Sequence, residues 1–194
     1  MPRGAGTGKQ SPRTMALLAE EIVEEWLNRQ GYFTIRGVKI GVHEMDILAV
    51  RATPNGLECR QVEVQASIRP VSYLTRVPKA VQKQTGRAAG SAKARPEEEL
   101  RQGVREWIEK KYDLPEKQRI RQRLAAGPWS RELVVHQVKY SKELELITEA
   151  GVIVRRLVDV LAELKRGGML LEAAAGAYLV DLVALTAATM SAEA

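Results

Sequence analysis

The spacing of apolar residues along the chain predicts one helix followed by a group of strands. Over residues 13–30, apolar side chains recur every three or four positions, and Gly31 follows as a typical helix end. The spacing then changes to that of strands, which we expect at about 32–38, 43–51 and 57–66. The sequence Pro54-Asn55-Gly56 is a strong hairpin signal, so the last two strands should be antiparallel neighbours.

The second half of the chain alternates helical and strand patterns. Residues 97–126 read as helical, and their acidic start suits a helix N-terminus. The elements expected next are a strand at about 131–138, a helix near 141–149, a strand at 152–157 and a helix at 158–166. Strands separated by helices imply partly parallel pairing. The sequence therefore predicts an α/β fold with a central mixed five-stranded sheet flanked by helices, and a C-terminal helical appendage.

Three parts of the chain follow from this pattern. They are a basic N-terminus expected to be mobile (1–12), one domain (13–166) and a C-terminal helix (167–194). The apolar stretch 169–190 is interrupted by two acids, which favours a buried or partner-facing helix over a membrane span. A homodimer or larger protein assembly through this helix is one interpretation of its apolar character.

Several classes of site and compartment are disfavoured by composition. Cys59 is the only cysteine, which excludes an internal disulfide, and two histidines are too few for a typical structural zinc site. Residues 4–9 look like a phosphate-binding loop, but Arg3 and Gln10 stand where that motif needs Gly and Ser or Thr. The N-terminus lacks the apolar core of a secretory signal, so we expect a cytoplasmic protein.

Positive charge concentrates in the segment 67–96, which contains seven Lys or Arg residues and no acid. The whole chain carries a net charge of +6 and has an isoelectric point near 9.5. A cationic segment without acids is typical of contacts with a phosphate backbone, so we expect a nucleic acid, DNA above all, as partner. The candidate nucleic-acid-binding residues are Arg69, Arg76, Lys79, Lys83, Arg87, Lys93 and Arg95. A solvated linker is the alternative interpretation.

Two acidic residues, Asp46 and Glu63, each interrupt a run that otherwise reads as a buried strand. A buried carboxylate is costly unless a partner neutralises it, and a divalent metal ion is one such partner. Because the two strands are expected to pair, Asp46 and Glu63 should approach each other. A salt bridge from Asp46 to Arg36 or Lys39, and a strand-edge charge at Glu63, are the structural alternatives.

Strand geometry adds a third polar group to this pair. Side chains alternate between the two faces of a strand, so Glu63 and Gln65 share one face and the apolar neighbours share the other. An active site needs its polar groups on one side, and this spacing provides that. In the first helix, Glu20 lies among other acids, so a solvated helix face is the alternative to a role as ligand.

With these residues in place, the chain resembles the restriction-endonuclease-like superfamily, the PD-(D/E)XK nucleases. The order of helix, three strands, helix, strand and helix is similar. Residues 19–66 are nearest in pattern to the archaeal Holliday-junction-resolvase and Mrr-like branches. Glu20 matches the acid of the first helix, Asp46 matches the lone Asp, and Glu63-Val64-Gln65 matches the Glu-x-Lys motif.

The resemblance implies a metal-dependent endodeoxyribonuclease. Mg²⁺ or Mn²⁺ would be held by Asp46, Glu63 and the backbone carbonyl of Val64, with Glu20 binding directly or through water. Gln65 stands where the family has a lysine that orients the attacking water and supplies positive charge, so Gln65 would position the water without adding charge. Two other interpretations stay open: a catalytically silent nuclease fold that binds nucleic acid or serves as a scaffold subunit, and a nuclease directed at RNA.

Overall fold

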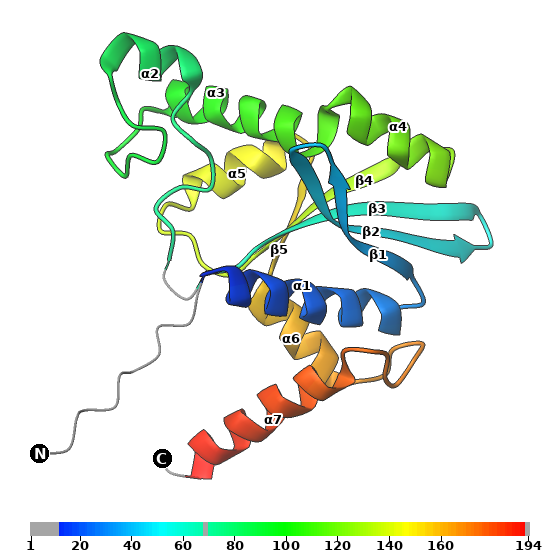
Figure 1. Cartoon of the computed structure of the whole chain (residues 1–194). Coiled ribbons are helices and arrows are strands. Elements are labelled where there is room, and N and C mark those ends of the chain that lie inside the picture. The colour runs from blue at the N-terminus through cyan, green and yellow to red at the C-terminus, as the bar shows by residue number, and fades with distance from the viewer. Residues whose placement is uncertain (1–11, 68–69, 193–194) are drawn as a thin grey trace, which may run out of the picture.

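In the computed structural model, which describes residues 12–67 and 70–192, the chain forms a mixed sheet with helices on both faces (Figure 1). This is the α/β architecture, with a five-stranded sheet and a C-terminal helix, that the sequence predicts. The N-terminus for which mobility is expected lies, apart from Pro12, outside the described residues.

The described strands follow one another across the sheet in their order in the sequence. They are β1 (Phe33–Ile40), β2 (His43–Thr53), β3 (Gly56–Gln65), β4 (Trp129–Val135) and β5 (Ile153–Arg156). The first three form an antiparallel meander, and β4 and β5 add in parallel to β3. The expected hairpin is confirmed, because Thr53 pairs with Gly56 across the β2–β3 turn.

The helices are divided more finely than the sequence pattern predicts. They are α1 (Pro12–Arg29), α2 (Lys79–Thr85), α3 (Glu97–Ile108), the π-helical turn η1 (Glu109–Asp113), α4 (Pro115–Leu124), α5 (Lys142–Glu149), α6 (Leu157–Arg166) and α7 (Ala177–Ala192). The single helix expected over 97–126 is broken before Pro115, because proline lacks an N–H and disfavours helical geometry in Leu114, whose ψ is 134°. The short helix α2 lies in the segment 67–96, for which the pattern predicts none.

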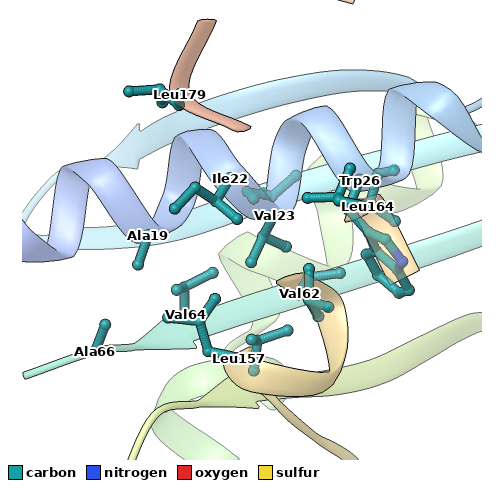
Figure 2. Packing of buried hydrophobic residues seen from close by; sticks show 14 of the residues in the cluster. Ala19, Ile22, Val23, Trp26, Val62, Val64, Ala66, Leu157, Leu164 and Leu179 are labelled. Atoms are coloured by element: carbon teal, nitrogen blue, oxygen red, sulfur yellow. The ribbon is translucent and has the colours of Figure 1, made fainter. Parts of the chain in front are cut away.

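Two apolar clusters, one on each face of the sheet, join the layers. In the first, α1, α6 and α7 pack on the central strands, and Figure 2 shows Val62 and Val64 of β3 facing the apolar side of α1. In the second, α3, η1 and α5 pack on β4, with Tyr112 and Leu133 among the buried residues. Because side chains alternate along β3, Glu63, which lies between Val62 and Val64, faces the layer of α3 and η1.

Glu25 fastens the C-terminal segment to α1. This buried carboxylate accepts hydrogen bonds from the backbone N–H groups of Ala174 at 2.9 Å and Gly176 at 2.8 Å, and from Nε of Arg29 at 2.7 Å. Leu179, in the first turn of α7, is buried in the same cluster as α1. The start of the C-terminal helix is therefore packed into the body of the protein.

Candidate active site

Asp46 and Glu63 lie on neighbouring strands, next to each other in the ladder. Ile47 pairs with Val62 in the β2–β3 register, and Asp46 and Glu63 are the next residues along that ladder. Oδ2 of Asp46 accepts a hydrogen bond from the backbone N–H of Val64 at 2.8 Å. This contact holds the half-buried Asp46 carboxylate against the strand that carries Glu63.

Both carboxylate oxygens of Glu63 have partners inside the protein. The residue is 1% exposed. Its Oε1 accepts a hydrogen bond from Nε2 of Gln61 at 2.9 Å, and its Oε2 accepts one from Nζ of Lys111 at 2.5 Å. Nζ of Lys117 lies 3.9 Å from Oε1. Because β3 lies between β2 and β4, a strand-edge charge is excluded as an explanation of Glu63.

A break in the helix brings Lys111 to this position. The chain leaves α3 through η1 and becomes extended at Leu114, and Pro115 opens α4. Pro115 lies four residues after Lys111 and has no N–H, so the Lys111 carbonyl lacks its usual helical partner. That carbonyl instead accepts hydrogen bonds from Nε2 of Gln61 and Nζ of Lys117, both at 2.8 Å. Single π-helical turns of this kind are frequent at functional sites.

Two buried cations of α4, Lys117 and Arg121, contact the sheet close to Glu63. The side chain of Lys117 is 2% exposed, and its Nζ also donates to the Glu44 carbonyl on β2 at 2.6 Å. Arg121 donates to Oε1 of Gln61. Burial lowers the pKa of both Lys117 and Arg121. Figure 1 shows the β1–β2 hairpin beside the junction of α3 and α4, where these contacts form.

The charge of Asp46 acts on the carboxyl groups of both Glu20 and Glu63. Burial, followed by the charges of Asp46 and Glu44, raises the pKa of Glu20 to about 7. Burial and the Asp46 charge raise the pKa of Glu63 to about 7, although Lys111 opposes the rise. Burial acts to lower the pKa of Lys111, but Glu63 and Asp46 outweigh it and leave that pKa raised. The three acids therefore form an anionic cluster, and Lys111 supplies a counter-charge.

Arg36, considered above as a partner for Asp46, pairs with acids of α1 instead. Its guanidinium nitrogens lie 3.1 Å from Glu21 and 3.3 Å from Glu24. Its charge only opposes the rise in the pKa of Glu20. Arg36 thus pairs with α1, and the charge of Asp46 acts on Glu20.

Gln65 ends β3 with an exposed side chain. It lies two residues after Glu63, on the same face of the strand. Its backbone carbonyl accepts a hydrogen bond from the N–H of His136 at 3.1 Å. Across the described ranges, its side-chain amide has no hydrogen-bond partner, so Gln65 does not take part in the network around Glu63.

The segment 67–96 contains cations of two kinds. Arg95, which is 8% exposed, donates to the Thr75 carbonyl at 3.0 Å and lies 4.0 Å from the centre of the Tyr73 ring. Arg87 pairs with Glu99 at 2.7 Å. The exposed cations are Arg76, Lys79, Lys83 and Lys93. Arg69 lies outside the described residues.

Glu143 of α5 anchors the beginning of this segment. The residue is fully buried. Its carboxylate accepts hydrogen bonds from the N–H of Leu74 at 2.6 Å, and from the N–H and Oγ1 of Thr75 at 2.9 and 2.5 Å. The position of the segment is therefore set by α5, by the ion pair of Arg87 and by the contacts of Arg95 with Thr75 and Tyr73.

Sequence reasoning missed Lys111, Lys117 and Arg121. These residues lie in a stretch that reads as one helix, and their partners on the strands are 48 to 73 positions away in the chain. No local pattern connects residues so far apart. The one available signal is Pro115, which predicts a break in the helix close to a run of lysines.

The donor set of the anionic cluster suits a hard divalent cation. Carboxylate oxygens are preferred ligands of Mg²⁺ and Mn²⁺, and such an ion would offset the negative charge of Glu20, Asp46 and Glu63. In the arrangement observed, the described residues include no group of three or more His, Cys, Asp or Glu side chains placed to hold a metal ion. An ion bound at Oε2 of Glu63 would compete with the Lys111 ammonium for that oxygen.

Comparison with protein-family models, curated proteins and solved structures found no match for this chain. The resemblance to the PD-(D/E)XK nucleases therefore depends on the residues and the order of elements described above. In the part of the chain that the structure describes, no helix combines the length and the apolar character that crossing a membrane requires.

Proposed function

We propose that the protein is a metal-dependent nuclease that hydrolyses phosphodiester bonds in DNA. The observation that carries this proposal is that the charge of Asp46 acts on two further carboxyl groups, each from a different element. Glu20 on α1 and Glu63 on β3 both have a pKa of about 7, partly because of the charge of Asp46 on β2. Carboxyl groups with pKa values raised in this way are frequent at catalytic sites, because catalysis needs like charges close together.

In this proposal, Asp46 and Glu63 hold Mg²⁺ or Mn²⁺, with Glu20 and the backbone carbonyl of Val64 as further oxygen ligands. When bound, the ion would lower the pKa of the attacking water and offset negative charge on the phosphate. The hydrogen bond from Val64 fixes the orientation of Asp46 in advance, so that Asp46 itself would need little rearrangement to bind the ion.

The reaction is the addition of water across one phosphodiester bond. The water oxygen forms a bond to phosphorus, and the bond from phosphorus to one sugar oxygen breaks. One proton of the water goes to solvent, and the departing sugar oxygen takes up one proton. Gln65, at the exposed end of β3, would hydrogen-bond the water but contribute no charge.

The exposed cations of the segment 67–96 would contact the DNA backbone. These are Arg76, Lys79, Lys83 and Lys93, whereas Arg87 and Arg95 support the segment through internal contacts. Phosphate contacts of this kind position a duplex without reading its sequence. We also propose that the protein is cytoplasmic and that it self-associates through α7.

A catalytically silent nuclease fold that binds nucleic acid is the second candidate. Two observations favour it: the exposed Gln65 where the family has lysine, and the missing three-ligand group among the described residues. The two candidates differ in what Asp46 does. A silent fold should bind DNA equally well without this carboxylate and should cleave nothing.

A cleavage assay separates the two candidates. Duplex, single-stranded, flap and junction DNA would be incubated with Mg²⁺ or Mn²⁺. Asp46→Asn should lower the cleavage rate by a factor of at least about 10², because it removes a charged ligand while the amide oxygen can still accept the Val64 hydrogen bond. The matched control Asp159→Asn changes an exposed residue of α6 and should cleave like the unsubstituted protein. Undiminished cleavage by Asp46→Asn would refute the assignment of the site.

A further inference from the structure

The geometry points to Lys111 as the catalytic cation that contacts the attacking water and the phosphate, the role that the family motif gives to a lysine at the position of Gln65. This inference rests on the nuclease function proposed above. It removes the main objection to that function, since the charge missing from β3 is supplied by the turn between α3 and α4.

The ammonium group of Lys111 lies at the candidate site. Nζ of Lys111 lies 2.5 Å from Oε2 of Glu63. Its charge also acts on Glu20, and the charge of Asp46 acts on it in turn. Lys111 is therefore in electrostatic contact with all three candidate acids of the site. The amide of Gln65 contacts none of them through a hydrogen bond in the described structure.

Accessibility distinguishes Lys111 from the other lysine near Glu63. About one third of the Lys111 side chain is open to solvent, at 30%, whereas Lys117 is buried. Nζ of Lys117 already donates to the carbonyls of Glu44 and Lys111. Lys117 thus connects α4 to β2 and η1. Lys111 is the lysine that a substrate phosphate can reach.

The backbone of Lys111 is held more firmly than its side chain. Its carbonyl accepts hydrogen bonds from Gln61 on β3 and from Lys117 on α4, which fixes the residue between a strand and a helix. The ammonium can exchange Glu63 for a water or a phosphate oxygen by rotation of the side chain alone. A charged donor that is held in advance near the position of developing charge is the arrangement that stabilises a transition state.

The chemistry asked of Lys111 is donation of hydrogen bonds as a cation. The Lys111 ammonium pairs with the Glu63 carboxylate at 2.5 Å and acts as a cation. It donates to the water oxygen and to a non-bridging phosphate oxygen, and no proton leaves the lysine during the step. An arginine at this position keeps the charge and the donors, whereas a methionine keeps only the length.

Four substituted proteins test the inference against a matched control: Lys111→Met, Lys111→Arg, Gln65→Lys, and the double variant Lys111→Met with Gln65→Lys. The control is Lys110→Met, which removes the same charge from the neighbouring, exposed residue of η1. Each protein is measured in three ways: the rate of cleavage at saturating duplex DNA with Mg²⁺, the Kd for that DNA in EDTA, and the midpoint of thermal unfolding.

We expect Lys111→Met to lower the cleavage rate by about 10²–10³, the usual effect of losing a donor that acts in the transition state. Its Kd for DNA should match that of Lys110→Met. Lys111→Arg should retain activity within about tenfold, in line with its preserved charge. Gln65→Lys should restore part of the activity lost in Lys111→Met, since residue 65 lies on the same face as Glu63.

Three results would overturn the inference. Lys111→Met cleaving at the rate of Lys110→Met would exclude a catalytic role. The second result combines three outcomes: Lys111→Met loses activity while its unfolding midpoint falls sharply, Lys111→Arg is stably folded but inactive, and Gln65→Lys gives no rescue. This combination would assign Lys111 a structural role only. No cleavage by the unsubstituted protein with either metal would overturn the proposed nuclease function itself, and this role of Lys111 with it.

Discussion

Glu63→Gln should make the metal-free protein more stable at pH 8. The substitution keeps the size of the side chain and an oxygen that can accept a hydrogen bond, but it removes the negative charge. Burial is the main cause of the raised pKa of Glu63, so the ionised form is less favourable in the folded protein than in water. Lys111 and Lys117 lose a counter-charge in the variant. The pKa of Glu63 is raised in spite of these lysines. The stability gained by removing the buried charge should therefore exceed the stability lost with the ion pairs.

The magnitude follows from the pKa. A carboxyl group whose pKa rises from 4.5 to about 7 disfavours its ionised form by about 3 kcal/mol. For a chain of this size, each kcal/mol changes the unfolding midpoint by about 2–4 °C, so the upper limit of the gain is about 6–12 °C. The folded state of the unsubstituted protein binds this proton more tightly than the unfolded state does. Its stability relative to the variant should therefore fall as the pH rises from 4.5 to 7 and level off above 7.

The assay is thermal or urea unfolding in EDTA at pH 5 and pH 8. Glu143→Gln is the matched control, because Glu143 is also a fully buried glutamate, but its oxygens accept hydrogen bonds from Leu74 and Thr75. A glutamine amide would face one of these backbone N–H donors, which cannot turn away. At Glu63, by contrast, the amide can face the partly exposed Lys111 ammonium, which can turn to solvent. We therefore expect Glu143→Gln to destabilise the protein by about 1–3 kcal/mol at pH 8.

The opposite sign at Glu63 would refute the reasoning. If Glu63→Gln were less stable than the unsubstituted protein at pH 8, the carboxylate would serve as a structural counter-ion for Lys111 and Lys117. Added Mn²⁺ provides a second check, because a ligand that binds only the folded state raises its stability. The unsubstituted protein should gain stability and Glu63→Gln should gain little. An equal gain in both would argue against Glu63 as a metal ligand.

Two further predictions concern the basic segment and the C-terminal helix. Replacing Arg76, Lys79 and Lys83 together by Gln should weaken DNA binding, and each lost phosphate contact should reduce the slope of log K against log salt by about 0.9 in an anisotropy titration. An unchanged slope would mark the segment as a solvated linker. Glu25→Ala should destabilise the protein by about 3–5 kcal/mol in urea unfolding, because it leaves Arg29 and two backbone N–H groups without their buried partner. A loss below about 1 kcal/mol would show that these contacts do not hold α7 in place.

The meander of β1, β2 and β3 could be predicted because its signals are local. Pro54-Asn55-Gly56 specifies the turn, and the period-two alternation on either side specifies which residues face α1. Once the hairpin is assumed, the approach of Asp46 to Glu63 follows from counting residues. The hydrogen bond from Val64 to Asp46 is consistent with that count.

The cations could not be sorted in this way. Lys93 and Arg95 lie two residues apart in one acid-free segment, yet Lys93 is exposed and Arg95 is buried against Tyr73 and Thr75. Charge counting treats the two alike, because the difference arises from contacts with residues about twenty positions away. The same limit applies to Lys111, whose partner Glu63 belongs to a strand in the other half of the domain.

The proline that opens α4 has a consequence for how this chain can vary. An ordinary amide at position 115 would offer its hydrogen to the carbonyl of Lys111 and continue the helix from α3. Gln61 and Lys117 would then compete with this backbone N–H for the carbonyl oxygen of Lys111. The Lys111 carbonyl oxygen can therefore accept either the helical hydrogen bond or the hydrogen bonds from Gln61 and Lys117. A substitution that makes this region a better helix, such as Pro115→Ala, should loosen the contact between β3 and α4 in the same step.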